Sequence, residues 1–200
     1  MLESLQAKPM QQQPIMKSFP ISVENYLAEE QESEVKHEYV NGYIYAMVGS
    51  SRRHNLLNVT LTTLFKMHLT GTGCQVFASV MKVKAGASTD DIFFYPDVVV
   101  SCSSNSQNPY IEEEPKLIVE ILSPSTEKYD RLAKLDAYTK ISSLEEYLLV
   151  DQNDLKIDLY QHDKGQWKLT RYSQGDELHL SSIDYSVAVS TIYQDVIGTI

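Results

Sequence analysis

The sequence predicts one α/β or α+β domain, built as a mixed central sheet flanked by helices, with a hairpin near its N-terminal end. Residues 52–69 repeat apolar side chains with a helical period. Two later segments, residues 93–101 and 116–122, are nearly continuous apolar runs, which suit central strands covered on both faces. Three short strand-like segments follow a second helical stretch. Strands and helices are therefore expected to mix in one layered structure.

The N-terminal part divides into a tail and a first helix and hairpin. Residues 1–19 are rich in Gln, Pro, Met and Lys without a clear period, which predicts a flexible tail. Residues 20–200 contain no repeat and no linker and are expected to form a single domain. Ser22 is a candidate N-cap for a short helix over residues 23–30. Strands over residues 37–40 and 43–48 flank Asn41-Gly42, the preferred pair for a tight hairpin turn.

The middle of the chain alternates helix and strand. The helix over residues 52–69 should end at Gly71 and Gly73, and a strand over residues 76–83 and a polar loop over residues 86–91 follow. The apolar stripe predicted for this helix consists of Leu56, Val59, Leu64 and Met67, widened by Leu57, Leu61 and Phe65.

The last third begins where Pro124, which lacks an N–H for a strand ladder, ends the second apolar run. Ser125 or Thr126 can then cap a helix over residues 127–141. Strands are expected over residues 145–151, 155–161 and 167–172, joined by short turns. A last short helix is expected to start after Ser190 and to run to Val196.

Composition limits the function classes. The chain has 200 residues, 42% hydrophobic and 22% charged, with no apolar run near the roughly 20 residues of a membrane helix. Two cysteines, Cys74 and Cys102, are too few for a secreted disulfide scaffold, and the N-terminus lacks a signal-peptide pattern. We therefore expect a cytoplasmic protein with both thiols reduced. The net charge of −10 argues against passive, charge-driven binding of nucleic acid or membrane, and less strongly against a nuclease that binds metal through carboxylates.

Two acids interrupt the central apolar runs. Asp97 lies in the first run and Glu120 in the second. A buried carboxylate is costly unless it is paired, hydrogen-bonded or bound to metal. Each acid alone could face solvent at a strand end or form a structural salt bridge. Two of them on neighbouring strands, about 4.8 Å apart, can converge on one hard cation such as Mg²⁺.

The predicted helix after Glu120 adds a lysine. Asp130, Lys134 and Tyr138 are spaced i, i+4, i+8 and share a face. An exposed Asp130–Lys134 pair is one interpretation. The other places the Lys134 ammonium at the strand ends, where it could hold an attacking water or stabilise phosphate charge.

These motifs together resemble the Uma family of endonucleases, in the PD-(D/E)XK restriction-endonuclease-like superfamily. The resemblance covers roughly residues 20–195. It rests on Tyr95-Pro96-Asp97, on Val119-Glu120-Ile121-Leu122-Ser123-Pro124-Ser125-Thr126, on Asp130, Lys134 and Tyr138, on His37-Glu38-Tyr39-Val40-Asn41-Gly42 with His54, and on Glu146-Tyr147-Leu148-Leu149-Val150-Asp151. It implies a restriction-endonuclease-like fold. The superfamily lysine two residues after the glutamate is replaced here by Leu122, and the resemblance points to Lys134 on the next helix instead.

The resemblance also implies roles. Asp97 and Glu120 would bind Mg²⁺ (or Mn²⁺), with the Ile121 carbonyl as a further ligand, and Lys134 would position the water or stabilise charge. Glu38 would complete the metal site or contact its water, unless it is a solvated hairpin acid. His54 would contact phosphate or transfer a proton, unless it makes only a local helix-end hydrogen bond. Lys82, which can sit on a strand face beside the acids, is the first alternative to Lys134.

The predicted function is Mg²⁺-dependent hydrolysis of DNA phosphodiester bonds, with a homodimer expected because cutting both strands favours two sites. Two alternatives stay open: a catalytically inactive binding or scaffolding module with the nuclease fold, and a metal-dependent hydrolase of another phosphoester. Zinc and phosphate-loop sites are not expected, because the sequence has no CxxC or HExxH motif and Gly71-Thr72-Gly73 lacks a following Gly-Lys.

Overall fold

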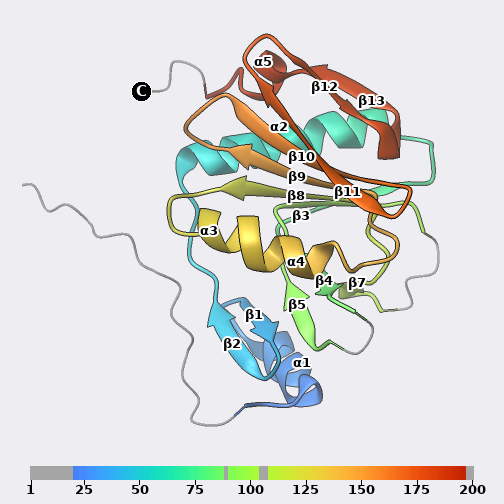
Figure 1. Cartoon of the computed structure of the whole chain (residues 1–200). Helices are drawn as coiled ribbons and strands as arrows, with labels where there is room; N and C mark the ends of the chain where they lie inside the picture. Colours follow the sequence, from blue (N-terminus) through green and yellow to red (C-terminus); the bar gives the residue numbers. More distant parts are fainter. Residues whose placement is uncertain (1–19, 88–89, 104–107, 197–200) are drawn as a thin grey trace, which may run out of the picture.

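A computed structural model describes residues 20–87, 90–103 and 108–196 of the chain (Figure 1). The predicted tail, residues 1–19, lies outside the described residues. The helical elements are α1 (Val23–Glu32), α2 (Arg52–His68), α3 (Glu127–Tyr129), the π-helical turn η1 (Asp130–Lys134), α4 (Leu135–Tyr138), the 3₁₀ turn η2 (Ser181–Ile183) and α5 (Val189–Ile192). The strands are β1 (His37–Val40), β2 (Tyr43–Ala46), β3 (Gln75–Ala78), β4 (Lys82–Ala85), β5 (Ile92–Phe94), β6 (Val98–Ser101), β7 (Ile111–Glu112), β8 (Leu117–Leu122), β9 (Glu146–Asp151), β10 (Lys156–Asp163), β11 (Gln166–Ser173), β12 (Glu177–Leu180) and β13 (Tyr185–Ala188).

The strands form two main sheets and a ribbon. Their orders are β11-β10-β9-β8-β6-β3, β2-β1-β5-β4-β7 and β12-β13. The six-stranded sheet is mixed, because β8 pairs parallel with β9 and antiparallel with β6. Helix α2 covers one face of this sheet, and the run α3-η1-α4 covers the other (Figure 1). The predicted α+β class, a mixed sheet flanked by helices with an N-terminal hairpin, is confirmed.

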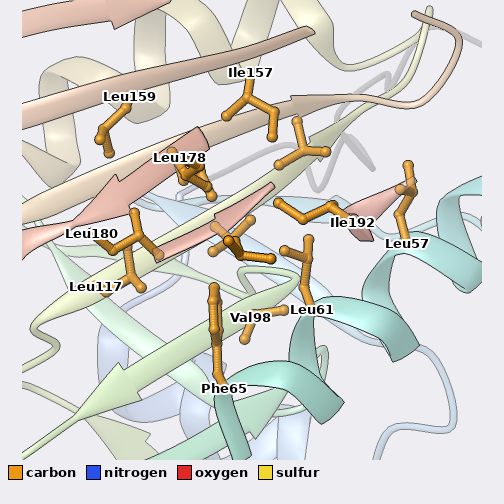
Figure 2. Close-up of a cluster of buried hydrophobic side chains, with 14 of the residues drawn as sticks. Leu57, Leu61, Phe65, Val98, Leu117, Ile157, Leu159, Leu178, Leu180 and Ile192 are labelled. Atoms are coloured by element: carbon orange, nitrogen blue, oxygen red, sulfur yellow. The ribbon is translucent and has the colours of Figure 1, made fainter. Parts of the chain in front are cut away.

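Strand β8 divides its side chains between the two cores. Leu117, Val119 and Ile121 pack with α2, β12 and β13 in the larger core, part of which is drawn in Figure 2. Ile118 and Leu122 belong to the smaller core under α4. Successive strand residues point to opposite faces. Glu120 therefore points to the same side as Ile118 and Leu122, toward the helical run that carries Lys134.

Two predicted strands are each broken in the structure. The segment 76–83 divides into β3 and β4, which belong to different sheets, and Ser79 between them has φ +49°. The segment 93–101 divides into β5 and β6 in the same way. Pro96 has no N–H for a ladder and marks the break. The prediction that Asp97 lies within a strand is therefore wrong: it lies in the short link before β6.

The helices also differ in detail from the predictions. The helix expected over residues 127–141 is a run of α3, η1 and α4 that ends at Tyr138. The apolar stripe of α2 is shifted, since Val59 and Met67 are 54% and 73% exposed. The buried row is Leu57, Leu61 and Phe65, at i, i+4 and i+8. Both rows are apolar, so the period alone did not decide which one faces the sheet.

The predicted N-terminal hairpin is confirmed. Val40 pairs with Tyr43, and Asn41 and Gly42 both have positive φ, +47° and +95°. A Cβ added at Gly42 would lie 2.5 Å from Cβ of Pro20. Glycine is therefore required here both for its backbone conformation and for the close approach of the chain.

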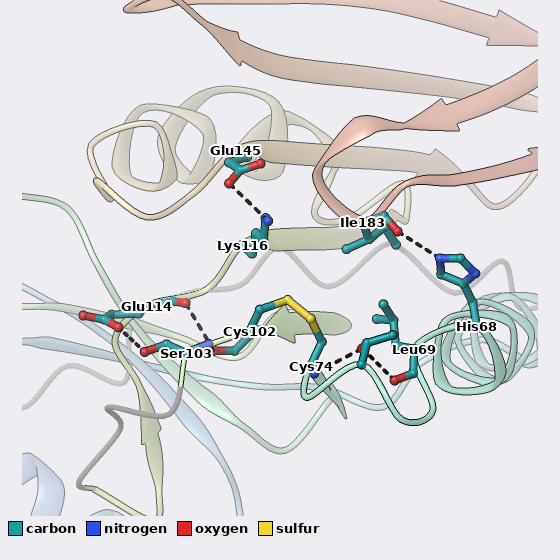
Figure 3. The surroundings of a disulfide bond; sticks show 11 residues. His68, Leu69, Cys74, Cys102, Ser103, Glu114, Lys116, Glu145 and Ile183 are labelled. Carbon is teal, nitrogen blue, oxygen red and sulfur yellow. Dashed lines mark hydrogen bonds and ion pairs between the residues drawn. A yellow bond between two sulfur atoms is a disulfide. The ribbon is translucent and has the colours of Figure 1, made fainter.

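A disulfide joins Cys74 and Cys102, so the prediction of two reduced thiols is wrong (Figure 3). The β3–β6 pairing sets Gln75 opposite Ser101, and the two cysteines are the next opposing residues, with Cα atoms 4.0 Å apart. Their separation of 28 residues carried no such signal, because the pairing arises from strands that the sequence did not assign to each other. Among the described residues, no helix is long and apolar enough to cross a membrane.

Candidate functional site

Acids from four separate segments meet in one cavity of about 640 Å³. Glu38 comes from β1, Asp97 from the link before β6, Glu120 from β8 and Asp130 from η1. The start of α2 and the segment 123–126, which precedes α3, form further parts of the lining. The cavity therefore lies where the hairpin, the central sheet and two helical segments meet.

Lys134 lies in the centre of these acids. Its Nζ is 2.9 Å from Glu120 Oε1, 2.9 Å from Glu38 Oε1 and 3.5 Å from Asp130 Oδ1. Its side chain is only 8% exposed. The interpretation of Asp130–Lys134 as an exposed surface pair is therefore wrong, and so is that of Glu38 as a solvated hairpin acid. Lys134 points to Glu120, as the convergence expected from the sequence requires.

The charge states in this cluster follow from burial and pairing. Burial raises the pKa of Glu120 well above its usual value, and Lys134 opposes this effect without cancelling it. Burial likewise raises the pKa of Asp130. For Lys134, burial would lower the pKa, but the carboxylates of Glu120 and Glu38 outweigh it and raise the pKa well above the usual value. Lys134 is therefore an ammonium ion at neutral pH.

Glu120 has a second donor, Tyr138. The Tyr138 hydroxyl donates to Glu120 Oε1 at 2.9 Å, so this oxygen receives both the phenol and the ammonium group. Tyr138 is fully buried, as is Tyr147, which donates to the Asp130 carbonyl at 3.1 Å. The i+4 spacing predicted that Tyr138 and Lys134 lie on one helix face. It did not predict that both donate to the same oxygen of Glu120.

Asp97 is held from both sides. Its Oδ1 lies 2.8 Å from His54 Nε2, and its Oδ2 accepts a hydrogen bond of 2.7 Å from the Ile121 N–H. His54 is on the first turn of α2, so it joins this helix to the carboxylate. The contact places His54 at the acid rather than in a purely local helix-end bond. Ile121 contributes its N–H to the site here, and the ligand role of its carbonyl stays a prediction.

The donor set suits a hard cation. Four carboxylates face one lysine and one histidine, and hard cations bind carboxylate oxygens. Among the described residues, the buried Glu38 Oε2 has no hydrogen-bond partner, and the buried Asp130 Oδ1 has only its 3.5 Å ion pair with Lys134. Such buried oxygens are costly to leave unsatisfied. In the described part of the chain, no group of three or more His, Cys, Asp or Glu side chains is placed so that it could hold a metal ion. A Mg²⁺ site built from these acids is therefore a proposal, which is taken up below.

Lys82 does not belong to this cavity. Its Nζ lies 4.7 Å from the centre of the Tyr26 ring and 5.6 Å from that of Tyr95, and the described residues that line the cavity do not include it. Lys82 is on β4, in the other sheet from Glu120. The prediction that it could stand beside the acids as an alternative to Lys134 is wrong.

Asn58 and Ser79 are among the cavity residues that the sequence did not predict. Both line the cavity, and Asn58 is 7% exposed. One signal was available for Asn58, because an amide next to the apolar row of α2 needs buried partners. Ser79 gave no comparable signal, since its position depends on the break between β3 and β4.

A family model described as "Uma2: Putative restriction endonuclease" matches residues 23–190 of the chain. The chain belongs to the Uma2 family. This match covers most of the sequence and contains every residue of the cavity described above. The resemblance to restriction-endonuclease-like proteins is thereby confirmed.

Two relatives in Synechocystis sp. support the Uma2 assignment. The uncharacterized protein slr1290 is 41% identical over 179 residues, which are 88% of this chain and 93% of the relative. The uncharacterized protein sll1609 is 33% identical over 156 residues, 75% of this chain and 86% of the relative. The shared sequence therefore extends over nearly the full length of each relative.

A solved structure shows the same fold. It is described as a "putative nuclease belonging to DUF820 from Anabaena variabilis" and has a TM-score of 0.67, with 16% sequence identity, over 88% of this chain and 98% of that chain. At this identity the likeness establishes the fold alone. Nuclease function is supported by the description of the Uma2 family, and the metal and the substrate of this chain belong to the proposal below.

Proposed function

We propose that this Uma2 protein is a Mg²⁺-dependent endonuclease that hydrolyses DNA phosphodiester bonds. The observation that carries the proposal is the meeting of Lys134 with Glu120 in a cavity that Asp97 also lines. An ammonium group beside clustered carboxylates can act on a phosphate and a water together. The description of the family supports the reaction class.

Asp97 and Glu120 would hold the metal, with Glu38 and the Ile121 carbonyl as further oxygen ligands. Bound there, Mg²⁺ would lower the pKa of a water molecule and neutralise charge on the phosphate. Glu120 has Oε1 fixed by Lys134 and Tyr138, which orients the carboxylate. His54 orients Asp97 through its 2.8 Å contact.

Lys134 acts in this proposal as a hydrogen-bond donor and a positive charge. Its raised pKa keeps the proton on Nζ, so it does not serve as a general base. Its N–H groups would hold the attacking water and stabilise the negative charge that develops on the phosphate. The residue that replaces the expected lysine, Leu122, is buried in the core under α4. Lys134 thus provides the ammonium group from the helical side of the sheet.

Cleavage of supercoiled plasmid DNA with Mg²⁺, and with Mg²⁺ plus EDTA, tests the proposal. We expect cleavage by the parent protein only when free Mg²⁺ is present. Glu120→Gln keeps the shape of the side chain and removes its charge, and it should lower the rate by roughly a hundredfold or more. The control is Glu145→Gln, on an acid whose side chain is 51% exposed and pairs with Lys116. This variant should cleave at the parent rate.

Full activity of Glu120→Gln would contradict the assignment of the site. Cleavage of a small phosphodiester but not of DNA would replace the proposal by a hydrolase of another phosphoester, and no cleavage of either would leave a binding module. RNA of the same sequence tests the preference for DNA. Size-exclusion chromatography of the active protein tests the expected homodimer.

A further inference from the structure

Hydrogen bonds from Asn58 and Ser79 fix the backbone at Asp97. Asp97 lies one position before β6, and its carbonyl accepts hydrogen bonds from Asn58 Nδ2 at 2.9 Å and from the Ser79 N–H at 2.9 Å. The Ser79 hydroxyl is a third donor, at 3.4 Å. The β3–β6 pairing ends with Ala78 opposite Val98, so these contacts continue the ladder by one step. They fix the main chain from which the Asp97 carboxylate projects.

Asn58 directs its amide group to this point. Besides the Asp97 carbonyl, its Nδ2 donates to Ser79 Oγ at 2.8 Å, and its Oδ1 accepts from Thr62 Oγ1 at 3.3 Å. Both amide hydrogens are thereby used. Ser79 is a non-glycine residue with φ +49°, a conformation that persists only where the surroundings determine it. Asn58 and the Asp97 carbonyl bind Ser79 here, and Lys36 Nζ donates to the Ser79 carbonyl at 3.3 Å.

Helix α2 therefore holds Asp97 at two places. His54 contacts the carboxylate, and Asn58, four residues later on the same face, binds the carbonyl. We propose that Asn58 is a positioning residue, which sets the place of the Asp97 carboxylate relative to Glu120 on the adjacent strand β8. This inference rests on the proposed function, since it concerns an acid assigned there to the metal.

The test measures Mn²⁺ affinity by electron paramagnetic resonance of the free ion, without substrate. Asn58→Leu has a similar volume and no hydrogen-bonding groups. It should weaken Mn²⁺ binding by about tenfold to a hundredfold, the usual effect of removing a group that orients a metal ligand. The matched control is Thr60→Val, on the same helix. Thr60 is 8% exposed, and its hydroxyl binds Asp195 at 3.4 Å, away from the cavity. The Thr60→Val variant should keep the Mn²⁺ affinity of the parent protein.

A second readout needs no metal. The nuclear magnetic resonance signal of the His54 imidazole N–H reports its hydrogen bond to Asp97. We expect it to shift in Asn58→Leu and to stay in place in Thr60→Val. Unchanged Mn²⁺ affinity in a folded Asn58→Leu variant would overturn the inference, because Asn58 would then have only a packing role.

If Asn58→Leu does not fold, Ser79→Ala takes its place. It removes one acceptor of the Asn58 amide and one donor to the Asp97 carbonyl, so weaker Mn²⁺ binding supports the inference and parent affinity overturns it. Failure of this inference can be distinguished from failure of the proposed function. A parent protein that binds Mn²⁺ and cleaves DNA, with variants of unchanged affinity, refutes the inference alone. A parent protein that binds no Mn²⁺ refutes the metal-dependent function together with it.

Discussion

Lys134 keeps a full charge inside the protein because three carboxylates surround it. Its sequence neighbours include Ala133 and Leu135, so nothing in the local pattern separates it from a lysine at a helix margin. The sequence predicted Lys134, Glu120 and Asp97 as site residues because polar groups in apolar segments need a reason. The resemblance added Glu38 and His54 to them. The sequence did not predict that Asp130 is buried in the same cluster, because this depends on how the helical run after β8 packs against the central sheet.

The first prediction concerns the stability that Lys134 provides. Lys134→Met should lower the free energy of unfolding by about 3–5 kcal/mol, since it leaves buried carboxylates without their cation. The measurement is urea denaturation at neutral pH. Lys140→Met is the control, on a lysine 44% exposed and paired with Asp136, and should cost under about 1 kcal/mol. The same Lys134→Met substitution should cost less in a Glu120→Gln background, because one of the acids is then neutral. A loss below 1 kcal/mol for the single variant would contradict the buried cluster.

At the scale of elements, the strands and helices were easier to predict than their ends. The Asn41-Gly42 turn and the apolar run of β8 carry strong local signals. The division of residues 93–101 into β5 and β6 does not, although Pro96 marks the place. The two strands belong to different sheets: β5 pairs with its neighbour β4 and with the distant β1, whereas β6 pairs with β3 and β8. The π-helical turn η1, where Asp130 and Lys134 lie, has no counterpart in the regular helical period.

The second prediction concerns the disulfide that links the ends of β3 and β6. Cross-linking residues 28 apart removes freedom from the unfolded chain. Reduction should therefore lower the free energy of unfolding by about 3–4 kcal/mol, by the chain-entropy estimate. Urea denaturation with and without a dithiol reductant measures this. The double variant Cys74→Ala with Cys102→Ala should have the same free energy of unfolding as the reduced protein. The reductant should not change the stability of this variant. Equal stability of the oxidised and reduced parent would contradict the prediction.

For the whole molecule, the net charge of −10 works against both folding and the approach of DNA. Part of this charge is concentrated in the cavity, where Glu38, Asp97, Glu120 and Asp130 meet. The sequence predicted the layered class and the order of most elements. It did not predict that the strands separate into two main sheets, because that choice is made by pairings between distant segments.

The third prediction is that Mg²⁺ stabilises the molecule. At a hundredfold excess over its dissociation constant, the ion should raise the free energy of unfolding by about 2.7 kcal/mol. Melting curves in MgCl₂ and in KCl of equal ionic strength separate binding from general screening. In Glu120→Gln the response to Mg²⁺ should shrink, because the site loses a charged ligand. An unchanged melting temperature of the parent at tens of millimolar Mg²⁺ would count against the metal site.

The disulfide also simplifies how the chain can be recovered from the unfolded state. Cys74 and Cys102 are the only cysteines in the sequence, so one chain has a single way to form an intramolecular bridge. Oxidative refolding therefore has no scrambled isomers to resolve, and a disulfide isomerase has nothing to correct within a monomer. The competing product is a chain linked to another chain. Its yield should rise with protein concentration, so dilution alone should favour the native bridge.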